Sequence, residues 1–216
     1  AKWKDGSEYI NLNKQATLVW LGNLASLEFH TTFNRIQKPF SPTNLVFDLD
    51  PSEGQGFEQV IEVALNVYDT LNKLNITSYV KTSGATGLQI YIPIGEKYDY
   101  NEARKISKFF AEYFANKYPE LITIERLKEK RGKKLYFDYL QMWEGKSIIT
   151  PYSPRATKYA SVSMPVKWEE VEAGIKPQDF TIFNALDRIK KVGDIFEPLL
   201  DNKNVESFSS ILQQIK

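Results

Sequence analysis

Two aspartates, Asp48 and Asp50, lie at the end of an apolar segment, residues 44–51, whose sequence is NLVFDLDP. In a β-strand, side chains two residues apart point to the same face, so these carboxylates lie side by side while Phe47 and Leu49 pack on the other face. Neighbouring carboxylates repel each other, and a cation between them keeps both ionised. Such oxygen ligands suit Mg²⁺ or Mn²⁺, which act in phosphate chemistry. The alternative is a strand end that leads into an ordinary turn of Pro, Ser and Gly.

A third carboxylate, Asp138, lies inside the apolar segment LYFDY, residues 135–139. An ionised side chain there costs free energy unless it is paired, bound to a metal or placed at the rim of a sheet. If this strand neighbours the strand of Asp48 and Asp50, the three carboxylates form a two-metal site. The alternative is an aspartate that caps a neighbouring turn.

A small-residue turn is predicted within the segment KTSGATGLQ, residues 81–89. Its glycines allow the backbone to approach a ligand closely, and its N–H groups could form a nest for a phosphate. The segment lacks the P-loop pattern, and many glycine-containing hairpins bind nothing.

Arginines in two further segments suit phosphate, because the planar guanidinium donates two hydrogen bonds at once. The segment TPYSPR, residues 150–155, ends in Arg155. A basic run leads into the strand of Asp138 and places Arg131 beside the proposed metals, unless it is an ordinary solvated loop. The basic residues of this run are Arg126, Lys128, Lys130, Arg131, Lys133 and Lys134.

Hydrophobic periodicity predicts the elements that position these side chains. Strands are expected over residues 9–12, 27–31, 45–50, 78–82, 88–94, 135–140 and 147–152. Helices are expected over residues 14–25 and 57–71, from an N-cap at Asn101 to just before Pro119, and over residues 204–215. The mixed order of strands and helices indicates an α/β (α+β) fold with a mixed central β-sheet flanked by helices.

Composition limits the function classes. The 216 residues carry a net charge of +1, so contact with nucleic acid requires a local basic patch. The chain has no cysteine and one histidine, which excludes disulfides and argues against a His-rich zinc site. No apolar run approaches the ~20 residues that span a bilayer, and no signal peptide is visible. The default expectation is a soluble intracellular protein.

Together these motifs resemble the polymerase/primase domain of bacterial ATP-dependent DNA ligase D, in the archaeo-eukaryotic primase superfamily. The resemblance rests on LVFDLDP (45–51), KTSG (81–84) with GL (87–88), FDY (137–139) and YSPR (152–155). The segments LEFH (27–30) and VSMP (162–165) with Trp168 are similar to further landmarks of the family. The motifs occur in the family's order along nearly the whole chain.

The resemblance implies a primase-polymerase-like catalytic core. Its activity would be template-dependent nucleotidyl transfer that fills or extends DNA ends in double-strand break repair by non-homologous end joining, with a preference for ribonucleotides and for Mn²⁺ over Mg²⁺. Asp48, Asp50 and Asp138 match the family's metal ligands. Positions that match its nucleotide-binding set are His30, Ser83, Gly84, Thr86, Gln89, Arg131 and Arg155. The implied partners are primer-template or gapped DNA ends, nucleoside triphosphates, the bacterial Ku protein and a ligase domain, in the cytoplasm at the nucleoid.

Three departures from the family pattern bear on this prediction. Thr86 stands where the family usually has lysine, and Gln89 where it usually has histidine. Glutamine can still donate a hydrogen bond but cannot carry charge, so triphosphate binding is expected to be weaker or differently arranged. Residues 1–216 are also expected to lack the family's N-terminal segment, either as a fragment or as a naturally shortened form.

The expected mechanism uses two metals, one to lower the pKa of a primer 3′-hydroxyl and one to hold the triphosphate. Asp50 would bridge both ions, while Arg131, Arg155 and the Ser83 turn would neutralise or bond the phosphates. Two alternatives remain open: a non-catalytic module that binds nucleotides or DNA ends, and a metal-dependent nuclease that uses the same carboxylates. A labelled primer separates the three, because it lengthens, stays the same or shortens.

Overall fold

A mixed six-stranded sheet in the order β5-β6-β2-β4-β3-β8 is the centre of the computed structural model, which describes residues 8–201 and 204–215. Every neighbouring pair in it is antiparallel except β5 and β6, which are parallel. The strands are β2 (Asn44–Asp50), β3 (Tyr79–Thr82), β4 (Leu88–Pro93), β5 (Ile122–Thr123), β6 (Leu135–Asp138) and β8 (Pro165–Val166). This arrangement confirms the predicted mixed sheet with flanking helices.

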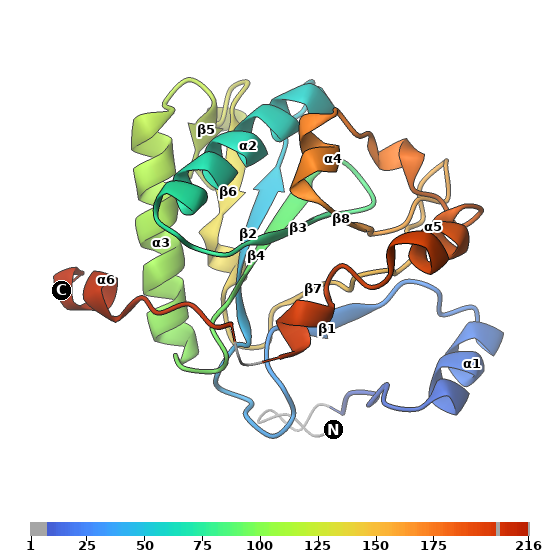
Figure 1. Ribbon diagram of the computed structural model, residues 1–216. Coiled ribbons are helices and arrows are strands. Elements are labelled where there is room, and N and C mark those ends of the chain that lie inside the picture. The colour runs from blue at the N-terminus through green and yellow to red at the C-terminus, as the bar shows by residue number, and fades with distance from the viewer. Residues whose placement is uncertain (1–7, 202–203, 216) are drawn as a thin grey trace.

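A second, two-stranded sheet pairs β1 (His30–Thr32) with β7 (Ser147–Ile149) and lies between the main sheet and helix α1 in Figure 1. The helices are α1 (Gln15–Asn23), α2 (Phe57–Lys73), α3 (Tyr100–Lys117), α4 (Trp168–Glu172), α5 (Ala185–Val192) and α6 (Ser209–Gln214). Short 3-10 turns occur at Lys128–Lys130, Tyr139–Gln141, Pro177–Asp179 and Glu197–Leu200. Over the described part of the chain, no helix combines the length and the apolar content that a membrane crossing requires.

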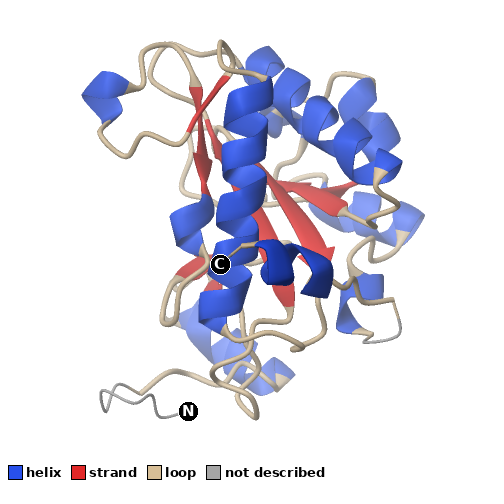
Figure 2. Ribbon diagram, turned by 90° about the vertical axis from the view of Figure 1, so that its left-hand side faces the viewer, coloured by secondary structure: helices blue, strands red, loops and turns tan. Residues whose placement is uncertain are grey.

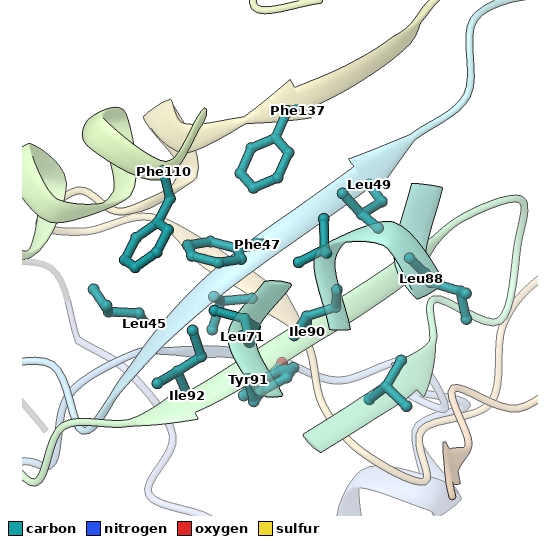
Figure 3. Close-up of a cluster of buried hydrophobic side chains, with 14 of the residues drawn as sticks. Leu45, Phe47, Leu49, Leu71, Leu88, Ile90, Tyr91, Ile92, Phe110 and Phe137 are labelled. Carbon is teal, nitrogen blue, oxygen red and sulfur yellow. The ribbon is translucent and has the colours of Figure 1, made fainter. Parts of the chain in front are cut away.

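One face of the sheet is apolar and is covered by α2 and α3. Leu45, Phe47 and Leu49 alternate along β2 and are fully buried. The ring of Phe47 lies 5.5 Å from that of Phe110 on α3 and 5.0 Å from that of Phe137 on β6, measured between centroids. Figure 3 shows this cluster, and Figure 2 shows the long helix α3 in front of the strands. Because this face is packed, the intervening residues of β2 are directed to the opposite face.

Several predicted boundaries were wrong for identifiable reasons. Residues 9–12 form no strand, because Tyr9, Ile10 and Leu12 are about half exposed and bury no apolar face. The predicted strands at 27–31 and 147–152 are shorter, at His30–Thr32 and Ser147–Ile149, and the final helix covers only Ser209–Gln214.

The ends of α3 and β6 also differ from the prediction, and in each case an aspartate is responsible. Asp99, rather than Asn101, caps α3: its side chain accepts a hydrogen bond from the Glu102 N–H, and the Glu102 side chain accepts one from the Asp99 N–H. This reciprocal pair is a capping box. Strand β6 ends at Asp138 because the Asp138 side chain accepts from the Leu140 N–H at 2.9 Å and turns the chain.

Candidate active site

A row of four polar side chains crosses four neighbouring strands on the face opposite α2 and α3. In the strand register Lys81 of β3 lies opposite Gln89 of β4, Gln89 lies opposite Asp48 of β2, and Asp48 lies opposite Asp138 of β6. Asp50 follows two residues after Asp48 and therefore shares its face. The antiparallel pairing of β2 with β6 thus brings the three aspartates of the sequence analysis together.

The aspartates already have hydrogen-bond partners within the chain. Asp48 Oδ1 accepts from the amide of Gln89 at 3.1 Å. Asp138 Oδ1 accepts from Leu140 N at 2.9 Å and from the Tyr136 hydroxyl at 3.2 Å. Asp138 therefore also caps a turn, the alternative role raised from sequence. As the side chains stand in the described part of the chain, no three of the acidic or histidine groups surround a common point where a metal ion would sit.

Electrostatics nevertheless mark Asp48 as a group that favours a nearby cation. Burial, followed by the charges of Asp50 and Asp138, raises the pKa of Asp48 from 3.8 to about 6, while the Gln89 hydrogen bond acts in the opposite direction. Burial also raises the pKa of Asp50, against the lowering effect of Arg131 and Lys128. A bound divalent cation lowers the free-energy cost of ionising clustered carboxylates of this kind. The donor set fits Mg²⁺ or Mn²⁺, although its present arrangement does not enclose an ion.

The turn between β3 and β4 lies directly against β2. A Cβ atom on Gly87 would clash with the Leu49 carbonyl oxygen, so only glycine permits this approach. Ser83 Oγ accepts from the N–H groups of Ala85 and Gly87 at 3.2 and 3.0 Å. Two N–H groups of the proposed anion nest are therefore already bonded to the turn's own hydroxyl. Thr86 is exposed at the tip of this turn.

Glu28 connects His30 with Arg155. Its Oε1 atom lies 2.9 Å from His30 Nε2 and 3.3 Å from Arg155 Nη1, and its other oxygen accepts from Ala156 N. These contacts, the His30 bond foremost, lower the pKa of Glu28. The Arg155 stem packs on the Ser83 turn, since a Cβ atom on Gly84 would lie 2.5 Å from Arg155 Cγ. His30, Arg155 and the turn therefore form one connected group.

Arg131 lies beside the carboxylates, as the sequence predicted. It lines a pocket of about 340 Å³ with Asp138 and a second pocket of about 400 Å³ with Asp50. Its guanidinium stacks 3.7 Å above the Tyr136 ring and donates to the Glu125 and Arg126 carbonyls. The first pocket is strongly basic and carries an aromatic ring; its other lining residues include Arg104, Arg126, Trp143 and Lys146.

Sequence reasoning did not single out three of these contributors. Lys81 and Glu28 lie inside the quoted motifs KTSG and LEFH, but their roles depend on contacts with residues distant in sequence. The Arg104 guanidinium stacks 4.4 Å from the centre of the Trp143 ring, and no local pattern joins a residue of α3 with one that follows β6. Gln89, predicted to face the nucleotide, is buried and bonded to Asp48.

Comparison with known proteins gives consistent matches. Residues 1–196 match the family model described as LigD, primase-polymerase domain. The chain is 44% identical to the bifunctional non-homologous end joining protein LigD of Bacillus subtilis, over 98% of this chain and 35% of that protein. It is 32% identical to the multifunctional non-homologous end joining protein LigD of Mycolicibacterium smegmatis, over 88% of this chain and 25% of that protein.

A solved structure has the same fold. The polymerase domain from Mycobacterium tuberculosis ligase D, in complex with DNA, superposes with a TM-score of 0.76 at 31% identity, covering 84% of this chain and 66% of that one. The matches define a class of protein, the primase–polymerase domains, which are DNA-directed nucleotidyltransferases. Within that class, the chain belongs to the LigD primase-polymerase domain family, as its motifs indicated. It spans about a third or less of the length of the two curated relatives, 35% and 25%.

Proposed function

We propose that this domain adds nucleotides to the 3′ end of a primer at broken DNA ends, under the direction of a template strand and with a bound divalent metal. The observation that supports this most is the strand register: Asp48 lies opposite Asp138, with Asp50 on the same face. Arg131 lines a basic pocket with Asp138 and a second pocket, of mixed charge, with Asp50. A polyanionic substrate beside clustered carboxylates is the arrangement that phosphoryl transfer uses.

Each group has a separate role in this proposal. Asp48, Asp50 and Asp138 hold Mn²⁺ or Mg²⁺, which when bound acts as a Lewis acid toward the phosphate and the attacking hydroxyl. Arg155 pairs with the triphosphate, and the Ser83 hydroxyl donates its own proton to a phosphate oxygen while its oxygen continues to accept from the Ala85 and Gly87 N–H groups. Arg131 keeps positive charge beside the carboxylates and the primer end.

Primer extension tests the proposal directly. The protein is incubated with a 5′-labelled primer annealed to a longer template, with Mn²⁺ and each nucleotide in turn. Extension that follows the template base supports the proposal. An unchanged primer would instead indicate a module that binds nucleotides or DNA ends without turnover, and a shortened one would indicate a nuclease.

Replacing Arg155 with alanine is expected to weaken nucleotide binding by about 1–3 kcal/mol, the contribution of a charge-assisted hydrogen bond in a partly desolvated site. The side chain of Arg155 is 25% exposed and is held by Glu28, so it is positioned before a ligand arrives. Nucleotide titration by calorimetry in the presence of Mn²⁺ measures the change. Arg35→Ala is the matched control, because Arg35 pairs with Glu96 at another surface. Equal nucleotide affinity of the Arg155→Ala variant and the wild type would show that Arg155 does not contribute to nucleotide binding.

Ribonucleotides are expected to be incorporated at least about tenfold faster than deoxyribonucleotides, since one hydrogen bond to the 2′-hydroxyl accounts for that factor. His30, Ser83 and Thr86 are the polar candidates for a hydrogen bond to the 2′-hydroxyl. If His30 makes this bond, His30→Ala should lower the ratio of the ribonucleotide rate to the deoxyribonucleotide rate. Single-nucleotide incorporation rates decide the question. Equal rates, or faster use of deoxyribonucleotides, would reject the preference and leave the polymerase assignment standing.

The biological setting is proposed on the basis of the family. We expect the substrates to be primer-template or gapped DNA ends and nucleoside triphosphates. We expect the partners to be the bacterial Ku protein and an ATP-dependent ligase domain, acting in the cytoplasm at the nucleoid. The DNA in the M. tuberculosis polymerase domain structure supports a DNA substrate for this chain.

A further inference from the structure

Lys81 is a fully buried lysine on β3. It forms one end of the polar row, and Asp138 on β6 forms the other end. Its side chain has no solvent exposure and ranks among the largest completely buried side chains. Among the residues that the structure describes, no carboxylate oxygen forms an ion pair with it. Burying an ammonium group without a direct ion pair is costly, so its position calls for a specific role.

The hydrogen bonds of Lys81 do not use its full capacity. An ammonium group has three donors. Lys81 Nζ donates to Ser163 Oγ at 2.5 Å and has a long contact of 3.4 Å with the Thr82 carbonyl. One donor of good geometry is therefore used, and the ammonium can serve another acceptor.

Gln89, directly opposite Lys81 in the register, holds a buried acceptor without a partner. Its Nε2 group donates to Asp48 Oδ1 at 3.1 Å, while its Oε1 atom has no hydrogen-bond partner in the described structure. A buried, unsatisfied amide oxygen is costly. The NH₂ group of the amide faces a carboxylate, and Lys81 is the cation next to Gln89 in the strand register. In the described part of the chain no hydrogen bond joins Lys81 Nζ to Gln89 Oε1, so the attraction between the two groups is that of a charge for a dipole.

We propose that Lys81 is a positioning residue that holds the Gln89 amide with its oxygen toward the ammonium and its NH₂ group toward Asp48, and so fixes a metal-binding carboxylate from behind. The reverse orientation of the amide places NH₂ against an ammonium and oxygen against a carboxylate, which both charges oppose. This role rests on the proposed function, because it takes Asp48 as a metal ligand. It also assigns a purpose to the glutamine that stands where the family usually has histidine.

Electrostatic coupling along the row is consistent with this geometry. Burial lowers the pKa of Lys81 to about 7, and the charge of Asp48 acts in the opposite direction, to raise it. The charge of Lys81 in turn lowers the pKa of Asp48. The two groups therefore favour each other's charged form across the neutral amide of Gln89. Residues that bond a metal ligand from behind contribute about 10- to 100-fold to metal affinity in other proteins.

A double-mutant cycle tests whether Lys81 acts through Gln89. Mn²⁺ affinity is measured by calorimetry without nucleotide or DNA for the wild type, Lys81→Met, Gln89→Met and the double variant. We expect Lys81→Met to raise the Mn²⁺ dissociation constant about tenfold in the wild-type background. In the Gln89→Met background the same change should have less than about a twofold effect, because the amide it positions is gone. Lys73→Met, at an exposed lysine at the end of α2, is the matched control and should leave the constant unchanged.

Other outcomes have defined meanings. An unchanged constant for Lys81→Met, or the same loss in both backgrounds, overturns the positioning role. If Lys81→Met does not fold, Lys81→Gln replaces it; this side chain is uncharged and shorter by one atom but keeps a donor for Ser163, and the same pair of results applies. A wild type that neither binds Mn²⁺ nor extends a primer would refute the proposed function itself. A wild type that does both, with full affinity in the Lys81 variants, would refute only the role of Lys81.

Discussion

Replacing Asp138 with asparagine is expected to lower the primer-extension rate on the order of a thousandfold while the domain stays folded. In the proposed function Asp138 helps to hold a divalent metal, and a bound metal supplies several kcal/mol of charge stabilisation in the transition state, which corresponds to such a factor in rate. The fold should survive because the Asp138 side chain accepts hydrogen bonds through Oδ1 from Leu140 N and the Tyr136 hydroxyl, and the asparagine oxygen can accept both. Single-turnover extension with saturating Mn²⁺ measures the rate, and thermal unfolding checks the fold.

A matched control exists for this variant. Asp99 also caps a backbone N–H, at the start of α3, and Asp99→Asn makes the same chemical change away from the polar row. It should extend primers at the wild-type rate. An Asp138→Asn protein that retains activity within tenfold of the wild type would show that Asp138 serves only its turn.

Asp48→Asn is expected to stabilise the metal-free domain at neutral pH, by up to about 3 kcal/mol. The pKa of Asp48 rises from 3.8 to about 6 on folding, so the folded state binds this proton more tightly than the unfolded state does. A shift of about two units corresponds to roughly 3 kcal/mol. In the wild type, the tighter proton binding of folded Asp48 contributes its full stabilisation below the unfolded pKa of 3.8. The wild type loses this contribution as the pH rises through the folded pKa near 6. Asparagine carries no titrating proton, so the Asp48→Asn variant does not lose it.

Urea unfolding between pH 4 and pH 8 in the presence of a chelator gives the comparison. The free energy of unfolding of Asp48→Asn minus that of the wild type should grow from about pH 4 to about pH 6 and then level off. Asp50, whose pKa is also raised, is present in both proteins, and its shift arises from burial and from other charges. Asp69→Asn, at an exposed aspartate on α2, is the control. A difference that stays flat across this pH range would contradict a raised pKa for the partly buried Asp48.

The strand of Asp48 could be predicted from sequence because its pattern is local. Leu45, Phe47 and Leu49 recur at every second position, and burial of the face that they share directs Asp48 and Asp50 to the other face. The pairing of Asp48 with Asp138 could only be proposed, because local patterns do not state which strands become neighbours. Asp99 is different: Asp followed three residues later by Glu is a readable capping signal, and the prediction placed the cap two residues too late.

The inner residues of the site were hidden for a physical reason. A lysine in a strand is usually solvated, so nothing local reveals that Lys81 has no exposure. Its ammonium group donates a hydrogen bond to Ser163, which lies 82 residues later in the sequence. The same holds for the N–H groups of the Ser83 turn: the sequence shows that they exist, and only the fold shows that the Ser83 hydroxyl already bonds two of them.

The central place of β2 in the strand order has a consequence for biosynthesis. During translation β2, β3 and β4 leave the ribosome well before β6, which must pair with β2 on its other side. Until β6 is made, the edge of β2 that will pair with it has unpaired backbone N–H and C=O groups. These groups can form hydrogen bonds with a strand of a second nascent chain. Strand pairing between distant segments is also slow. A chain released before β6 is complete is therefore a predicted source of aggregation.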